Sequence, residues 1–381
     1  MDSTTRLQDD ATVVARIFDH IDHQTTDVGE TTWREPVENY RSPERFAAEL
    51  EILRRYPVPF CPSAALREPG SYVARSAGGT PLIAVRGNDG QVRVFRNACR
   101  HRGTQLAAGA GCQKAFVCRY HGWTYGLDGR LRHVPHEHGF PGLDKDARGL
   151  VAVQSVETEG LVFVTQQSTL SLDAELDRLP RLIPPSCRLI RTNEGEVPAN
   201  WKILVEGFLE GYHIRSTHQT TFYPVQFDNL NVVETFGRNR RIAFPYRAIN
   251  KLRAAAPAER SAEGKLTYVY HLFPNAMVAT FPGRIFLILL EPLAIDCTRQ
   301  IAYVLSDRED DDAEAQAALK RGGDFVDAGA AEDRDVASSI QRSVASGANE
   351  FFEFGLFEAA IGHFHRTLRA ALGAQDGCKR G

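Results

Sequence analysis

Hydrophobic and polar positions follow two different patterns along the chain. Between residues 58 and 165, apolar residues come in short runs separated by turn residues. Pro81–Val85 and Val92–Phe95, for example, flank Gly87-Asn88-Asp89-Gly90. Short apolar runs joined by Asn, Asp and Gly predict antiparallel β-hairpins. We therefore predict a small antiparallel β domain in this region, closed by the run Leu161–Val164.

Helical and strand patterns surround this β domain. Ser42, Pro43 and Glu44 predict a helix start, because serine is a good N-cap and proline fits the first helical position. After the β domain we predict four helices, over Asp173–Leu179, Asn200–His213, Asp333–Ser346 and Phe357–Leu372. Six runs without intervening helices predict an antiparallel sheet, over Asn231–Phe236, Arg241–Phe244, Leu266–Leu272, Ala276–Phe281, Arg284–Glu291 and Arg299–Ser306.

These patterns predict an α+β fold in three parts. Residues 1–57 form an N-terminal segment that packs with the C-terminal part, residues 58–165 form the β domain, and residues 166–381 form a domain of antiparallel sheet and helices. A chain of 381 residues is long enough for two domains.

Composition narrows the class of protein. Hydrophobic content of 43% and charged content of 24% are those of an ordinary globular protein. The net charge of −3 gives no reason to expect binding to nucleic acid or to an anionic membrane. The first 27 residues are polar without the apolar stretch of a secretory signal, and no apolar run approaches the ~20 residues of a membrane span. Scattered cysteines fit a reducing cytoplasm, so we expect a cytoplasmic protein.

Two cysteine–histidine pairs carry the strongest chemical signal. Cys99 and His101 are separated by one residue, and Cys118 and His121 by two. Two thiolates and two imidazoles can hold a [2Fe–2S] cluster, with the thiolates on one iron and the imidazoles on the other. A structural zinc site is the alternative, since Cys₂His₂ also suits tetrahedral zinc. Zinc ligands usually come in Cys–Cys and His–His pairs, however, and the mixed pairs here favour the cluster.

The flanking residues add a family resemblance. Asn97–Gly103 and Cys118–Trp123 resemble the Rieske iron–sulfur domain of the ring-hydroxylating, non-haem iron oxygenases. Respiratory Rieske proteins have an extra cysteine beside each pair, where Thr104 and Tyr120 stand here, so the resemblance is to the oxygenases. It implies that Cys99, His101, Cys118 and His121 bind the cluster.

A second group of residues resembles the catalytic domain of the same oxygenases. His213 and His218 follow Asn200-Trp201-Lys202, and non-haem iron oxygenases use two histidines and one carboxylate, which leave positions open on the iron. The resemblance implies a helix-grip fold and an Fe(II) ligand at Asp333, within Glu332-Asp333-Arg334-Asp335. Asp335 and, less so, Glu332 are rivals, and this acidic group could instead be a charge cap at a helix N-terminus.

Glu210 has a different implied role. In the family, a carboxylate at this position links a histidine of each metal centre, here His213 and His121 of a neighbouring subunit, in a homotrimer. Most ring-hydroxylating members have aspartate, whereas glutamate is typical of a branch acting on carnitine and betaines. Gly211 and Ile214 depart from that branch, which often has cysteines there. We also expect six apolar residues to line the substrate pocket: Phe208, Leu209, Phe222, Tyr223, Met277 and Phe281.

The resemblance implies an oxygenase component that uses O₂ to hydroxylate or demethylate a small aromatic or heteroatom-bearing molecule. The chain has neither a Gly-rich dinucleotide fingerprint nor the cysteine run of a plant-type ferredoxin. Electrons must therefore come from NAD(P)H through a separate reductase, with or without a ferredoxin. Two alternatives stay open: a monooxygenase of quaternary amines such as carnitine, which would need an aromatic cage for the cation, and a non-enzymatic Rieske electron carrier.

Overall fold

The chain divides into two units in the computed structural model, which describes residues 7–167, 172, 176, 178–308 and 313–378. Leu53–Leu189 form one unit, here called the β unit. Met1–Ile52 and Ile190–Gly381 together form the other, here called the mixed unit. The domain limits at residues 58 and 165 remain a prediction, as does the placement of residues 1–57. The predicted helix Asp173–Leu179 lies largely outside the described residues.

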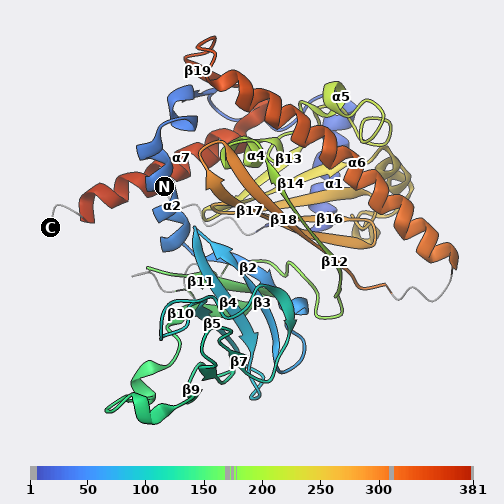
Figure 1. The fold of residues 1–381 in the computed structure, drawn as a ribbon. Coiled ribbons are helices and arrows are strands. Elements are labelled where there is room, and N and C mark those ends of the chain that lie inside the picture. Colours follow the sequence, from blue (N-terminus) through green and yellow to red (C-terminus); the bar gives the residue numbers. More distant parts are fainter. Residues whose placement is uncertain (1–6, 168–171, 173–175, 177, 309–312, 379–381) are drawn as a thin grey trace. The chain divides into compact units, whose positions relative to one another are not determined.

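The β unit contains a seven-stranded sheet in the order β2-β11-β10-β5-β4-β3-β6 and a three-stranded sheet, β7-β8-β9 (Figure 1). The predicted hairpin is confirmed, because β4 and β5 pair antiparallel and Gly90 adopts a positive φ in the turn. A core that includes Phe95, Phe116, Trp123 and Tyr125 joins the sheets. The strands are Val58–Pro62 (β2), Ser71–Ala77 (β3), Thr80–Arg86 (β4), Val92–Arg96 (β5), Gly109–Cys112 (β6), Phe116–Val117 (β7), Thr124–Tyr125 (β8), Leu131–His133 (β9), Ala152–Thr158 (β10) and Leu161–Thr165 (β11).

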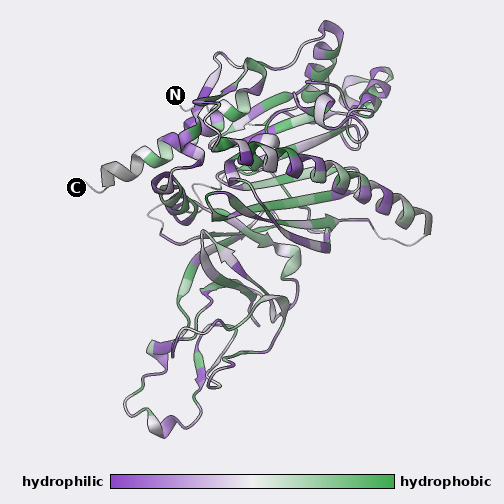
Figure 2. Cartoon of the chain, turned by 45° about the horizontal axis from the view of Figure 1, so that its top comes forward, coloured by the Kyte–Doolittle hydropathy of each residue, from purple (hydrophilic) through white to green (hydrophobic). Residues whose placement is uncertain are grey.

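The mixed unit is built on a seven-stranded sheet in the order β12-β18-β17-β16-β15-β14-β13. The predicted strands are confirmed, and β15 and β16 match at both ends. β15 is buried along its whole length, so both faces of the sheet are covered. Figure 2 shows hydrophobic residues (green) concentrated in these strands. The strands are Arg188–Val197 (β12), Val232–Phe236 (β13), Asn239–Pro245 (β14), Leu266–Leu272 (β15), Ala276–Phe281 (β16), Arg284–Ala294 (β17) and Cys297–Ser306 (β18).

Helices pack on this sheet, and a small two-stranded sheet ties the early and late segments together. Trp33–Pro36 (β1) pairs antiparallel with Phe351–Phe354 (β19). α4 contacts both β17 and α6, α5 contacts α6, and α7 contacts β1 and β19 (Figure 1). The helices are Asp10–His23 (α1), Pro43–Arg55 (α2), Trp201–Gly207 (α4), Ile214–Thr217 (α5), Ala313–Val344 (α6) and Ala359–Cys378 (α7). Within the described residues, no helix is both long and apolar enough to cross a membrane.

The predictions for α4 and α6 were wrong in extent, and α1 was not predicted. α4 ends at Gly207 rather than continuing to His213, because residues 208–213 form turns. α6 begins at Ala313, well before Asp333, because Ala-rich sequence continues the helix through its glycines. The polar N-terminal segment contains α1, whose Val13, Val14, Ile17 and Phe18 are buried.

Candidate metal centres

The two cysteine–histidine pairs lie in turns of the same construction. In each, a glycine N–H donates to the carbonyl oxygen of the cysteine, at 2.9 Å for Gly103 and Cys99 and at 2.8 Å for Gly122 and Cys118. Both glycines adopt a positive φ, which a residue with a side chain rarely does. The two turns therefore present their cysteines and histidines in matching ways.

The side chains of these turns provide a suitable donor set for a cluster. Cys99 and Cys118 are buried free thiols, and the rings of His101 and His121 have centroids 4.7 Å apart. Burial, and the charges of His121 and Arg102, lower the pKa of His101, which favours the neutral imidazole that a metal requires.

Tyr125 completes the surroundings of Cys99. Its hydroxyl accepts a hydrogen bond from the Arg100 N–H at 2.9 Å and lies 3.3 Å from Cys99 Sγ. Burial and this contact raise the pKa of Tyr125, so the phenol keeps its proton. A phenol that accepts from the backbone has its own proton left to donate to sulfur, which stabilises a thiolate. The donor set and its surroundings thus fit a [2Fe–2S] cluster held by Cys99, His101, Cys118 and His121.

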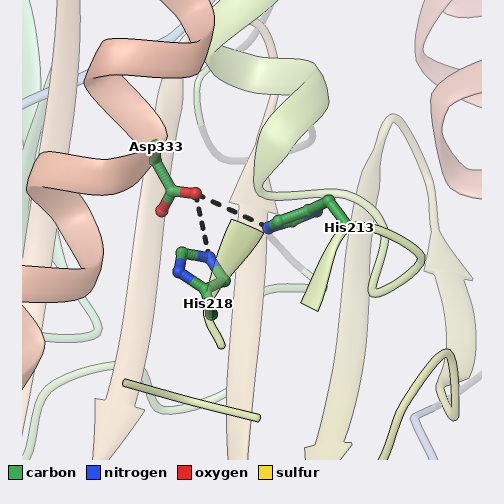
Figure 3. Close-up of side chains that lie close together, drawn as sticks. All are labelled: His213, His218 and Asp333. Carbon is green, nitrogen blue, oxygen red and sulfur yellow. Dashed lines mark ion pairs between the residues drawn. The ribbon is translucent and has the colours of Figure 1, made fainter. Parts of the chain in front are cut away.

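The second centre lies in the mixed unit. His213, His218 and Asp333 form the only group of three or more His, Cys, Asp or Glu in the described residues whose ligand atoms all lie within 4.8 Å of one another. Asp333 Oδ1 is 3.0 Å from His218 Nε2 and 3.5 Å from His213 Nε2, and Figure 3 shows both rings directed at this carboxylate. The four residues of the β unit do not gather in this way, since a two-iron cluster distributes its ligands over two metals.

Local structure explains how the histidines meet. α5 is a single turn of helix, and His213 and His218 occupy the positions just before and after it. Glu210 stabilises the preceding turn, because its carboxylate accepts the N–H groups of Tyr212 and His213. Glu210 therefore neighbours His213 through a turn, and not within a helix as the prediction over Asn200–His213 implied.

The Asn200-Trp201-Lys202 motif anchors α4. The Asn200 side chain accepts the N–H of Lys202 at 3.1 Å and caps the helix. Trp201 Nε1 and Lys202 Nζ both donate to Glu49 Oε2, at 3.0 and 2.8 Å, and all three residues are buried. This motif therefore fixes the helix that precedes the histidines and supplies no donor to the three-residue group.

Carboxylates also hold the outer nitrogen of each histidine. His213 Nδ1 contacts Glu210 Oε1, and His218 Nδ1 lies 2.7 Å from Glu332 Oε2. Burial opposes protonation of His213, but the hydrogen bond and charge of Glu210 outweigh it and raise its pKa. A carboxylate at Nδ1 fixes the tautomer that leaves the Nε2 lone pair free for a metal. The triad therefore fits a single Fe(II), to which His213, His218 and Asp333 would each give one atom.

The structure separates the three acidic candidates. Asp333 lies within the triad, Glu332 contacts the far side of His218 and also accepts the Thr221 hydroxyl at 2.6 Å, and Asp335 is exposed. The alternative of a charge cap is wrong, because α6 starts at Ala313 and these residues lie inside it. The sequence analysis missed the contact of Glu332 with His218, which joins residues 114 positions apart.

A cavity of about 380 Å³, here called the main cavity, opens beside the triad. Of the predicted pocket residues, Phe208, Phe222 and Phe281 line it. Leu209, Tyr223 and Met277 are not among its lining residues, and Met277 is fully buried elsewhere in the sheet. The lining residues that the sequence analysis missed come mainly from the sheet: Phe244, Thr267, Val269, Ala279, Phe286, Ile288 and Ala302.

Two family models match the chain. Residues 56–156 match the model of the Rieske [2Fe-2S] domain, and residues 177–374 match the catalytic domain of the ring-hydroxylating alpha subunit. The chain belongs to this family. The predictions of the ring-hydroxylating oxygenase family, of the α+β fold, and of a Rieske [2Fe–2S] cluster with mononuclear iron are confirmed.

Individual relatives of this chain include carnitine monooxygenase oxygenase subunits. The Acinetobacter pittii subunit is 30% identical over 211 residues, which cover 52% of this chain and 56% of the relative. The chain thus spans about half the length of that relative. The Escherichia coli (strain K12) subunit is 27% identical over 360 residues, which cover 88% of this chain and 93% of the relative.

A solved structure of a quaternary ammonium Rieske monooxygenase, bound to an inhibitor, shares the fold. Its TM-score is 0.77 at 21% identity, and the match covers 97% of this chain and 99% of that one.

Proposed function

We propose that this protein is the oxygenase component of a multicomponent Rieske non-haem iron oxygenase that hydroxylates or demethylates a small organic molecule. The observation that carries the proposal is the group of two histidines and one aspartate in the wall of the main cavity. Three protein ligands on one side of Fe(II) leave positions for O₂ beside a bound substrate. A Rieske electron carrier would need no such group, so this geometry argues against the non-enzymatic alternative.

The lining of the main cavity supports a substrate that is largely apolar. The Phe281 ring packs against two others, with its centroid 6.4 Å from that of Phe222 and 5.4 Å from that of Phe286. Phe222 also packs against the His218 ring at 4.7 Å. A substrate lying on these rings would therefore be close to the metal ligands. Gln226 and Thr267 add neutral polar groups to the same cavity, and charged groups come from Glu194, Glu196, Asp327 and Arg334, so the cavity also has positions for a polar or charged substituent of the substrate.

A quaternary amine is the second candidate. Glu210 and the carnitine monooxygenase relatives favour it. Phenyl rings can bind a cation through their faces, although Trp is the better ring and neither Trp nor Tyr lines the main cavity in the described residues. The packing of Phe281 against Phe286 at 78° places the edge of one ring on the face of the other, which reduces the ring surface available to a cation.

The partners follow from the resemblance. We infer that electrons come from NAD(P)H through a separate reductase, with or without a ferredoxin, and that the working form is a cytoplasmic homotrimer. The Glu210 carboxylate would then accept a hydrogen bond from His121 of a neighbouring subunit. Tyr212 is 56% exposed, so the turn that Glu210 stabilises lies at the surface of the mixed unit, where another subunit can approach.

Metal analysis with EPR spectroscopy tests the function. We expect three irons and two acid-labile sulfides per chain, a Rieske-type signal after reduction by dithionite, and a high-spin Fe–NO signal after nitric oxide is added. A Rieske signal without the Fe–NO species would favour the electron carrier, and zinc without sulfide would contradict the assignment of the cluster. Addition of a neutral aromatic or of a trimethylammonium compound should perturb the Fe–NO signal for the correct substrate class only.

A further inference from the structure

A second cavity adjoins two of the three triad residues. It measures about 240 Å³, and His213, Asp333 and Glu210 line it as they line the main cavity. Most of its remaining lining comes from α4, α6 and residues near the start of α7, and it includes Glu206 and Glu358. His213 and Asp333 therefore border two cavities, and the phenylalanines of the seven-stranded sheet line only the main cavity.

Glu206 also lines a third pocket, here called the outer pocket. It measures about 890 Å³ and is formed largely by residues 347–354, of which Gly347–Glu350 and Glu353 are exposed. Among the described residues, Glu206, Ile340 and Phe354 line both this outer pocket and the second cavity. Only Glu206 of these three has a side chain that can carry a proton.

Only one of the two carboxylate oxygens of Glu206 is held by hydrogen bonds. Its Oε1 accepts the Tyr40 hydroxyl at 2.6 Å and lies 2.9 Å from His365 Nε2. No hydrogen bond from the described residues reaches Oε2, which leaves that oxygen for the cavities.

Burial favours the protonated form of Glu206. The side chain is buried in the mixed unit, and burial raises its pKa to about 8, although the Tyr40 hydrogen bond and the Lys202 charge act in the opposite direction. His365 has its pKa lowered to about 3, mainly by burial, so it adds no positive charge at neutral pH. The titratable groups packed around Glu206 come from every neighbouring element: Glu35, Tyr40, Glu49, Lys202, Glu210, Glu358 and His365.

We propose that Glu206 transfers protons from the outer pocket, through the second cavity, to the oxygen that is reduced at the metal site. The proposal rests on the proposed function, because only an oxygenase consumes protons there. Insertion of one oxygen atom into a C–H bond takes the substrate, O₂, two electrons and two protons, and gives the hydroxylated product and water. Insertion of both atoms takes the same two electrons and two protons.

Each transfer leaves Glu206 ready for the next. The carboxyl Oε2–H bond breaks as the proton passes to water in the second cavity, and water there passes a proton on to the reduced oxygen. A cavity of this size with several polar groups in its wall can hold water. The Glu206 carboxylate then takes a new proton from the outer pocket, so no net charge stays buried. Electrons reach the iron by the separate route through the cluster.

Glu206→Gln tests the transfer, because glutamine keeps the shape but carries no acidic proton. In the iron-loaded enzyme with saturating reductase we expect turnover to fall at least about tenfold, as for the loss of a general acid. Hydrogen peroxide released per O₂ consumed should rise, and the solvent deuterium isotope effect on turnover should change. Wild-type turnover should decline as the pH rises past about 8, where Glu206 loses its proton, and the variant should lack this decline.

Glu353→Gln is the matched control. Glu353 lines the same outer pocket but is exposed and pairs with Arg34 at the surface, so we expect wild-type turnover and peroxide release. Wild-type behaviour of Glu206→Gln in all four measurements would overturn the proposal. If the wild type lacks iron or a Rieske signal, the proposed function fails, which is a different result.

Infrared spectroscopy tests Glu206 without turnover. The wild type should show a protonated carboxyl band that disappears near pH 8 and is absent from Glu206→Gln. Tyr40→Phe, which removes the donor to Oε1, should shift the same band, and it supplies the test if Glu206→Gln does not fold. Absence at pH 7 of any band that Tyr40→Phe shifts would overturn the proposal.

Discussion

Each histidine of the triad lies between two carboxylates. His218 contacts Asp333 through Nε2 and Glu332 through Nδ1, while His213 contacts Asp333 and Glu210 in the same way. The outer carboxylates orient the rings and make the imidazoles more basic. Their contribution to iron binding can therefore be measured separately from that of the ligands.

Glu332→Ala should weaken Fe(II) binding by about 10- to 100-fold, because it removes the acceptor of His218 Nδ1 and of Thr221. Iron retained after dialysis against a graded series of chelator concentrations measures this effect. Asp335→Ala removes an exposed carboxylate three residues further along α6 and should leave iron binding unchanged. Equal losses in the two variants would show that Glu332 acts only through the general charge of this helix.

The sequence could identify residues that stand in short motifs or that match the motifs of the family. Cys99, His101, Cys118 and His121 stand in two short motifs, and His213 and His218 lie close together. Glu206 gave no such signal, because its partners Tyr40 and His365 are 166 and 159 residues away in the sequence. A burial-induced change of pKa depends on segments that meet only in the folded chain.

At the scale of elements, α6 illustrates what local pattern can and cannot decide. Its Gly322, Gly323 and Gly329 weaken the helical signal, so the sequence predicted a helix only from Asp333 onward. Close packing explains one of these glycines. A Cβ on Gly329 would lie 2.4 Å from the Phe222 ring, so glycine lets α6 approach the aromatic wall of the main cavity. β12 was missed for a related reason, since its charged and mostly exposed residues lack strand alternation.

Two glycine-to-alanine changes in α6 should have opposite effects on stability. Gly329→Ala should destabilise the protein by about 1–3 kcal/mol, because the methyl group must displace Phe222 from its packing against His218, Phe281 and Phe325. Gly322→Ala should stabilise it by up to about 1 kcal/mol, because nothing lies within 4 Å of a Cβ there and alanine favours helix. Urea unfolding monitored by circular dichroism gives both values. Equal effects of the two changes would contradict the close approach.

At the scale of the whole molecule, transfer of electrons between subunits can be tested by mixing inactive chains. Cys118→Ser should lack the cluster and Asp333→Ala should lack the iron, so neither should turn over alone. Co-expressed with different tags and purified as hybrids, they should recover about one third of wild-type turnover, since in a cyclic trimer that contains both variants an intact cluster lies beside an intact neighbouring iron at one interface in three. Hybrids as inactive as the parents would contradict the bridge through Glu210. Native mass spectrometry of the hybrids serves as the control for assembly.

The mixed unit is assembled from two segments that enclose the β unit in the sequence, and this arrangement sets an order for biosynthesis. Domains tend to fold as units while the chain is being made, beginning from the N-terminus. The β unit, with all four of its cluster donors, leaves the ribosome before Asp333 has been synthesised. α1 and β1 meanwhile wait for partners such as β13 and β19. A nascent chain can therefore receive its iron–sulfur cluster before its iron triad exists, so the two metal centres need not compete for iron during maturation.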